Sequence, residues 1–144
     1  MKVLKMSLFI QELARSFDAQ VGQGGRDRFL RDVGRQMGSR LTLPPCESLE
    51  MLELEMNALF DLIGWGRASL DVSNTDRKLV IKHTGLPVIA SMGEPSGCWL
   101  AAALAGLYSI WMEQQPDSLS DARIRWEVEK GAGNAHVITL TYGR

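Results

Sequence analysis

Few residues of the types that carry enzyme chemistry occur in this sequence, and they are not grouped. The two histidines, His83 and His136, lie about fifty residues apart in segments with the alternation of β-strands. No H-x-x-x-H or C-x-x-C pair accompanies them, so the sequence offers no zinc site. Cys46 and Cys98 could pair, but buried free thiols of a reduced compartment are the expected state. A nucleophilic dyad between Cys98 and a histidine stays open at this point.

Carboxylates and glycines give two further patterns that chemistry could use. Glycoside hydrolysis needs two carboxylates opposed across the scissile bond, whereas Glu50, Glu53 and Glu55 follow one amphipathic helix and are expected on its solvated side. The glycines of residues 22–25 precede a helix, but no strand comes before them and neither phosphate-loop pattern is present. The carboxylates therefore predict a solvated face, and the glycines predict a turn between two helices.

Two remaining groups could contact ligands or build structure. Ser96 is a suitable N-cap and Pro95 fixes the direction of the chain before a helix, so capping accounts for this motif without an anion at the helix N-terminus. Tryptophan rings can stack on sugars, but they more often fill cores or interfaces. The four tryptophans are Trp65, Trp99, Trp111 and Trp126. The sequence predicts no catalytic residue, no metal and no cofactor.

Hydrophobic periodicity predicts the elements that would position these residues. Apolar side chains at three-to-four spacing predict helices, and two-residue alternation predicts strands. The predicted helices cover residues 6–19, 26–41, 47–63 and 96–114; the strands cover 67–73, 78–83, 124–128 and 138–142. Because each strand pair is joined by a short turn, the fold class is α+β. We expect one domain, residues 1–144, with a four-stranded antiparallel sheet of two hairpins packed against about four helices.

Two helices carry features that call for a close neighbour. In the second, Gly34 and Gly38 are four residues apart, which lowers helix propensity and indicates close approach of another backbone. Its apolar face is predicted to hold Phe29, Leu30, Val33, Met37 and Leu41. In the fourth, residues 98–111 are apolar nearly all round, so every side should be buried. Burial within one subunit and burial against a second subunit both stay open.

Composition excludes some functions. The chain has 144 residues, 45% hydrophobic and 23% charged, with a formal net charge of −1 from interspersed signs. A nucleic-acid binder would show a basic excess, so a protein or an uncharged polymer fits better as partner. The N-terminus is not a convincing signal peptide, and the longest apolar run is too short to span a bilayer. A cytoplasmic protein is expected.

Three segments together resemble a known family. Residues 33–40 run into Pro44 and Pro45, residues 57–66 form the second segment, and residues 93–101 form the third, with Gly106, Leu107, Tyr108 and Trp111 behind it. In order and spacing, across about residues 7–112, they resemble the D subunit of bacterial cellulose synthase.

The resemblance implies an α+β subunit without enzymatic activity that assembles into a ring-like, cylindrical homo-octamer, a tetramer of dimers. Its partners would be further copies of itself, the cellulose synthase complex, a small proline-rich companion protein and glucan chains in internal passages. The passage-lining candidates are Lys2, Val3, Leu4, Lys5, Met6 and Ser7. The architectural or assembly motifs are Gly34, Arg35, Gly38, Pro44, Pro45, Gly64, Trp65, Gly66, Gly93, Glu94, Pro95, Ser96, Gly97, Trp99 and Trp111.

Two other functional interpretations of the sequence compete with a cellulose synthase subunit. The glycine-arginine helix, the apolar helix and the hairpins also resemble vinyl-reductase-type ligand-binding and vesicle-tethering domains, which would make the chain a dimeric small-molecule sensor. An enzyme would need a convergent polar cluster. The family has also been placed in the periplasm; in the cytoplasm, the protein would organise synthase complexes instead of threading glucan through a ring.

Overall fold

The computed structural model describes residues 2–73, 75, 77–86, 98–116, 122–130 and 136–143, with backbone alone for 2–7, 10, 11, 23, 98, 99, 130 and 136. The elements in chain order are α1 (Lys2–Arg40), α2 (Leu49–Ile63), β1 (Arg67–Val72), β2 (Leu79–Thr84), α3 (Cys98–Glu113), β3 (Arg123–Lys130) and β4 (His136–Gly143). The strands form a four-stranded sheet in the order β1-β2-β4-β3, and every neighbouring pair is antiparallel. The predicted α+β class and the two hairpins are confirmed.

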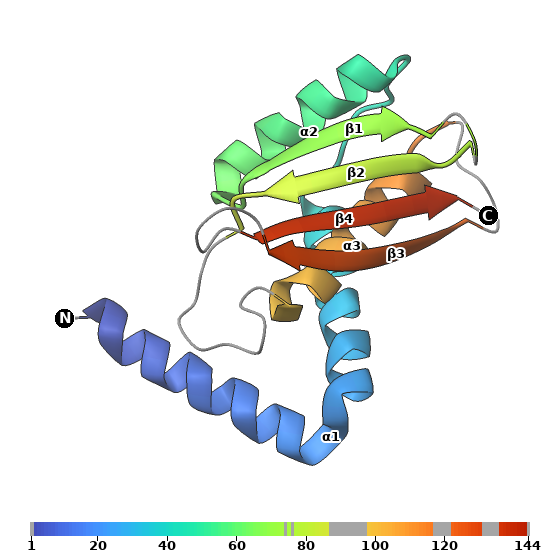
Figure 1. Ribbon diagram of the computed structural model, residues 1–144. Helices are drawn as coiled ribbons and strands as arrows, with labels where there is room; N and C mark the ends of the chain where they lie inside the picture. The colour runs from blue at the N-terminus through green and yellow to red at the C-terminus, as the bar shows by residue number, and fades with distance from the viewer. Residues whose placement is uncertain are drawn as a thin grey trace.

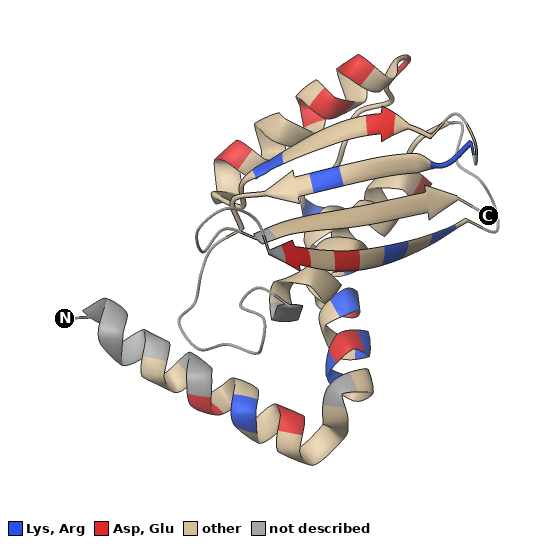
Figure 2. Cartoon of the chain, viewed as in Figure 1, with Lys and Arg blue, Asp and Glu red and all other residues tan. Residues whose placement is uncertain are grey.

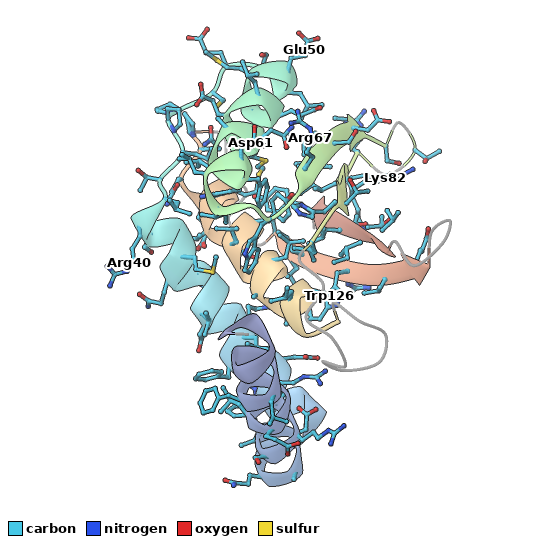
Figure 3. All side chains as sticks on the ribbon, turned by 90° about the vertical axis from the view of Figure 1, so that its left-hand side faces the viewer. Arg40, Glu50, Asp61, Arg67, Lys82 and Trp126 are labelled. Atoms are coloured by element: carbon cyan, nitrogen blue, oxygen red, sulfur yellow. The ribbon has the colours of Figure 1, made fainter. Side chains whose placement is uncertain are left out.

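The molecule is layered (Figure 1). In the side view of Figure 3, α3 lies between the sheet and the C-terminal part of α1, while α2 runs beside β1. Alternate side chains of each strand face α3, which follows from the two-residue period of a strand. This inner face holds Leu70, Ile81, Ile124, Ile138 and Leu140, all at most 8% exposed.

The helix α1 has a sharp bend where the sequence predicts a turn between two helices. Gly22 has φ 75° and ψ 170°, while helical residues continue on both sides of it. This backbone conformation is essentially restricted to glycine because any Cβ would clash. The predicted four-residue break is therefore confined to one residue. We call residues 2–21 the projecting helix, because they extend away from the body of the molecule (Figure 1).

Close contact between α1 and α3 buries the apolar helix within a single chain. A Cβ on Gly34 would lie 1.8 Å from the carbonyl oxygen of Ala103, and one on Gly106 would lie 1.9 Å from the carbonyl oxygen of Arg31. Residues 101–108 of α3 are all buried. The predicted close backbone approach at Gly34 is thus present, and its partner is α3 of the same chain.

The predicted inner face of residues 26–41 is partly wrong. Leu30 is buried and Met37 packs against the core, but Phe29 and Val33 are exposed. The cause is the glycine contact: Gly34 and Gly38 turn toward α3, so the side of the helix that carries Phe29 and Val33 turns away from it.

Side chains of α3 and of the residues just after it hold the segment that joins α1 to α2. The indole of Trp111 donates to the carbonyl oxygen of Leu41 at 2.7 Å. The Gln115 amide accepts from the backbone N–H of Cys46 at 2.9 Å and donates to the carbonyl oxygen of Pro44 at 3.2 Å. The bend at Pro44 and Pro45 is therefore fastened to the C-terminal end of α3.

The helix α2 begins and ends with standard caps. The Ser48 hydroxyl accepts from the N–H of Met51 at 3.1 Å, and Gly64 ends the helix in a left-handed conformation with φ 70°. Gly66 follows with φ 90°, and a Cβ there would lie 2.0 Å from the carbonyl oxygen of Thr84. The glycines around Trp65 therefore have architectural roles.

Candidate functional site

His83, one of the two candidate catalytic histidines, lies in the core. Its Nε2 is 2.6 Å from the carbonyl oxygen of Trp65, and its Nδ1 is 2.8 Å from the Tyr108 hydroxyl. A carbonyl only accepts, so Nε2 carries the proton and donates to Trp65, while Tyr108 donates to Nδ1. Burial lowers the pKa of His83 to about 4, although its hydrogen bond to Trp65 opposes this shift. His83 is therefore neutral at pH 7, with both ring nitrogens engaged.

Aromatic rings surround His83. The ring centroid of Phe60 lies 4.6 Å from that of His83, 5.6 Å from Tyr108 and 5.2 Å from Trp111, all edge to face. Burial raises the pKa of Tyr108 well above its usual value. Tyr108 accordingly stays protonated and keeps its hydrogen bond to His83. This cluster joins α2, β2 and α3, and its chemistry is structural.

Of the other candidates for nucleophilic catalysis, the structure describes the side chain of Cys46. Cys46 is a free thiol that donates to the carbonyl oxygen of Pro44 at 3.3 Å. Burial, and secondarily the charge of Glu55, raises the pKa of this thiol, which disfavours the reactive thiolate. The side chains of Cys98 and His136 lie outside the described residues. Within the part of the chain that the structure describes, no group of three or more His, Cys, Asp or Glu residues could hold a metal ion.

The acidic residues of α2 have separate surroundings. Glu50 is exposed, as predicted, and Glu55 is half-buried. Glu53 is also half-buried, because its carboxylate accepts from the backbone N–H of Leu70 at 3.2 Å. The prediction of a solvated position is therefore wrong for Glu53 and Glu55. All three carboxylates belong to the single helix α2.

The tryptophans with described side chains belong to the core or its border. Trp111 is fully buried, and Trp65 and Trp126 pack against the core while partly exposed. The Arg31 guanidinium lies 5.3 Å from the Trp126 ring centroid. The motif of residues 93–97 and the side chain of Trp99 lie outside the described residues. The three described tryptophans therefore serve packing.

The surface most suited to a function is the apolar face of the projecting helix. Leu8 is 61% exposed, Phe9 is 62% exposed, and Leu13 and Val21 are also exposed. Phe9 and Leu13 are four residues apart on one side of the helix, and Leu8 lies next to Phe9; we call these three exposed residues the stripe. Contiguous apolar side chains left in water mark a surface that binds another protein or a membrane. The sequence shows this amphipathic pattern; the structure adds that the stripe has no cover among the described residues of its own chain.

Contacts across the bend hold the projecting helix in place. The rings of Phe17 and Phe29 are 5.1 Å apart on opposite sides of Gly22. Arg26, itself 6% exposed, donates to the Asp18 carboxylate at 3.0 Å. An apolar contact and a charged contact thus set the angle at which the stripe is presented. The passage candidates, residues 2–7, continue this helix, and their side chains lie outside the described residues.

A second exposed apolar stripe runs along α2. Leu54 is 69% exposed, Leu62 is 76% exposed, and Met51 lies on the same side. Figure 2 shows acidic residues along α2, and residues 47–66 include no lysine or arginine. The described helices include none that is long and apolar enough to cross a membrane. Exposed apolar side chains of this kind fit contact with a partner surface.

Comparison with known proteins places this architecture among relatives. The profile of the family described as the D subunit of cellulose synthase matches residues 2–143. A cellulose synthase operon protein D of Komagataeibacter xylinus is 43% identical over 129 residues, covering 90% of this chain and 83% of the relative. A second protein of that name from the same species is 41% identical over 123 residues, covering 85% and 79%. A protein of the same name from Komagataeibacter sucrofermentans is 39% identical over 123 residues, covering 85% of this chain and 79% of the relative.

A solved structure with low sequence identity shares the fold. It is a trafficking protein particle complex subunit 3 from Naegleria fowleri covalently bound to palmitic acid. The TM-score is 0.51 at 12% identity, covering 96% of this chain and 95% of that one. The likeness establishes a common fold and nothing further about function.

Proposed function

The chain belongs to the D-subunit family of cellulose synthase, and from this premise we propose that it is a non-catalytic subunit that self-assembles to organise glucan chains. The family gives the chain a role in cellulose synthesis as an accessory protein. The observation that carries the finer proposal is the apolar stripe of the projecting helix, which is exposed with respect to the described residues of its own chain. A stripe of this kind is stable in solution when a second subunit covers it.

The proposed assembly is a homo-octamer built as a tetramer of dimers. Burying Leu8, Phe9 and Leu13 between copies would release each fully covered side chain from water, which stabilises association by about 1.5–3 kcal/mol per side chain. Residues 2–7 would then approach the interior of the ring and line passages for glucan. A neutral polymer suits such passages, because it can slide without strong charge contacts.

We place this scaffold in the cytoplasm, with the periplasm as the alternative. The free thiol of Cys46 supports a reducing compartment. In the cytoplasm, the ring would organise neighbouring synthases, together with the synthase complex and a small proline-rich companion protein. A fusion to a reporter that matures on one side of the membrane only distinguishes the two compartments.

The first experiment measures solution mass by light scattering coupled to size exclusion. The wild type is expected near eight times the 16.0 kDa chain. Replacing Leu8, Phe9 and Leu13 by serine should reduce that mass. The matched control replaces Glu12, Arg15 and Gln20 by serine, which lowers helix propensity on the same segment but leaves the stripe intact. The control should keep the wild-type mass.

Results in cells complete the test. Deleting the gene should leave glucan polymerisation in isolated membranes intact but reduce the order of the cellulose produced, and the stripe variant should not restore that order. A wild type that stays monomeric at all concentrations contradicts the proposal. A dimer that carries a small molecule, detected by mass spectrometry of the denatured protein, would support the small-molecule sensor instead.

A further inference from the structure

The two edge strands of the sheet differ in whether side chains hydrogen-bond to their outward backbone groups. At the β1 edge, side chains of α2 occupy backbone groups: the Asn57 amide accepts from the N–H of Ala68 at 2.7 Å and donates to its carbonyl oxygen at 3.0 Å. Glu53 accepts from the N–H of Leu70 at 3.2 Å. The opposite edge strand, β3, has eight residues, and no side chain of the described residues occupies its backbone groups in this way. An edge strand without such cover can pair with another strand.

The outward side chains of β3 carry an ordered set of charges. Arg123 and Arg125 come first, then Glu127 and Glu129, all on the face of the sheet away from α3. Figure 2 shows them as two blue positions followed by two red ones. None of these four side chains has an ion-pair partner among the residues that the structure describes. Their opposite neighbours on β4 are uncharged: Gly143, Thr141, Thr139 and Val137.

This order of charges is complementary to itself when the strand direction is reversed. We propose that β3 pairs antiparallel with β3 of a second copy about a two-fold axis at Trp126. Arg123 then faces Glu129 of the second copy, and Arg125 faces Glu127 of the second copy, with the same contacts repeated in the other direction. Opposite charges directly across two strands attract, and like charges repel. The two four-stranded sheets become one continuous sheet.

The charges also select the register. Sliding the second strand by two residues in either direction puts Glu127 opposite Glu127, or Arg125 opposite Arg125. A slide by one residue turns the side chains of the two strands to opposite faces. Only pairing centred on Trp126 satisfies all four charges. The same residues disfavour pairing with strands of other sequence, because a charged edge resists unspecific association.

The inner side of β3 is apolar and fits the same axis. Ile124 would face Val128 of the second copy, and the two Trp126 side chains would be neighbours at the centre. Trp126 and Val128 are half-buried in the single chain, so pairing removes further apolar area from water. Arg31 packs against the Trp126 ring at 5.3 Å and would remain at the border of the contact.

The inference rests on the self-assembly put forward as the proposed function and names one of its interfaces. The projecting helix and β3 belong to separate elements, and their described residues share no hydrogen bond or ion pair. Two such surfaces on one subunit supply the two kinds of contact that a tetramer of dimers requires.

Charge exchange tests the pairing. R123E/R125E makes the outward charges of β3 uniformly negative, and E127R/E129R makes them uniformly positive. Each variant alone replaces four attractive cross-strand contacts by four repulsive ones, which should raise the dissociation constant of this interface roughly 100-fold. Mixing the two variants should restore association as a mixed complex, and the variant with all four exchanges should associate with itself.

Controls keep the result specific. R67E/K82E makes the same change of net charge on β1 and β2, away from the β3 edge, and should leave the mass unchanged. Circular dichroism and the thermal midpoint establish that each variant folds; if R123E/R125E does not fold, R125Q/E127Q tests the central contacts with a smaller change.

The outcomes separate the inference from the proposed function. Loss of mass in each charge variant, with recovery on mixing, supports β3 pairing. If both variants keep the wild-type mass while the Leu8, Phe9 and Leu13 variant loses it, the β3 interface is overturned and the self-assembling scaffold stands. If the wild type itself is monomeric, both are overturned.

Discussion

Replacing Gly34 by alanine tests the contact that buries α3. A Cβ at this position would lie 1.8 Å from the carbonyl oxygen of Ala103, 2.7 Å from its carbonyl carbon and 2.9 Å from the backbone nitrogen of Leu107. These are backbone atoms inside a helix, so no side-chain rotation relieves the overlap. To restore contact distances above about 3.3 Å, α1 and α3 must separate by about 1.5 Å.

The expected loss of stability follows from two opposing effects. Overpacking against a rigid neighbour costs about 3 kcal/mol, the upper part of the usual range, because the helices separate along the contact that Leu30, Ala102 and Ala103 fill. Alanine returns about 1 kcal/mol through its better helix propensity. The net change in unfolding free energy is therefore about −2 kcal/mol, which lowers the thermal midpoint by about 6 °C for a chain of this size.

The assay is thermal and urea unfolding of G34A beside a matched control, G24A. Gly24 lies in the same helix, but a Cβ there meets nothing within 4 Å. G24A should therefore raise the unfolding free energy by about 0.5–1 kcal/mol. If G34A is as stable as G24A, the close contact of α1 with α3 is refuted. G106A, whose Cβ would lie 1.9 Å from the Arg31 carbonyl oxygen, should be less than additive with G34A because one separation relieves both overlaps.

Further predictions concern buried polar groups. The pKa of His83 is about 4 in the folded chain and about 6.5 when unfolded, so the unfolded state binds a proton more readily between these pH values. Stability should thus fall by up to about 3 kcal/mol as pH drops from 6.5 to 4, and H83Q should flatten this dependence in urea titrations; an unchanged slope would contradict it. N57L leaves both backbone groups of Ala68 without their partner and should reduce the unfolding free energy by about 2–4 kcal/mol. E53Q keeps an acceptor for the N–H of Leu70 and should change the unfolding free energy in urea by less than about 1 kcal/mol; equal effects of N57L and E53Q would refute the role of Asn57.

The order of helices and strands could be predicted from periodicity because each element has one apolar face. All four strands occur within two residues of their predicted bounds, and the sheet is formed by the two predicted hairpins. Periodicity says nothing about which strands of the two hairpins meet. The pairing of β2 with β4, which places β1 and β3 at the edges, depends on tertiary packing.

The candidate site was harder to predict, because exposure depends on what the rest of the chain covers. The spacing of Leu8, Leu13 and Phe17 predicts an amphipathic helix whether its apolar face meets a core or solvent. The bend at Gly22 decides whether that face meets the core or solvent, because it sets the direction of the residues before it. The charge order on β3 is visible in the sequence, but it acquires meaning only when β3 is known to be an edge.

Burial of α3 within its own chain bears on where the contacts of the proposed assembly would lie. An apolar helix of this kind suggests a subunit interface, yet α1 and the sheet already cover residues 101–108. After Gly22, the side of α1 that carries Gly34 and Gly38 is occupied by that contact, whereas the exposed apolar residues before Gly22 do not take part in it. In the proposed assembly, Gly22 thus separates the part of α1 that packs on α3 from the part that would contact another copy. Substitutions after the bend, such as G34A, should lower stability and assembly together, whereas substitutions of Leu8 or Phe9 should reduce assembly without lowering the stability of the monomer.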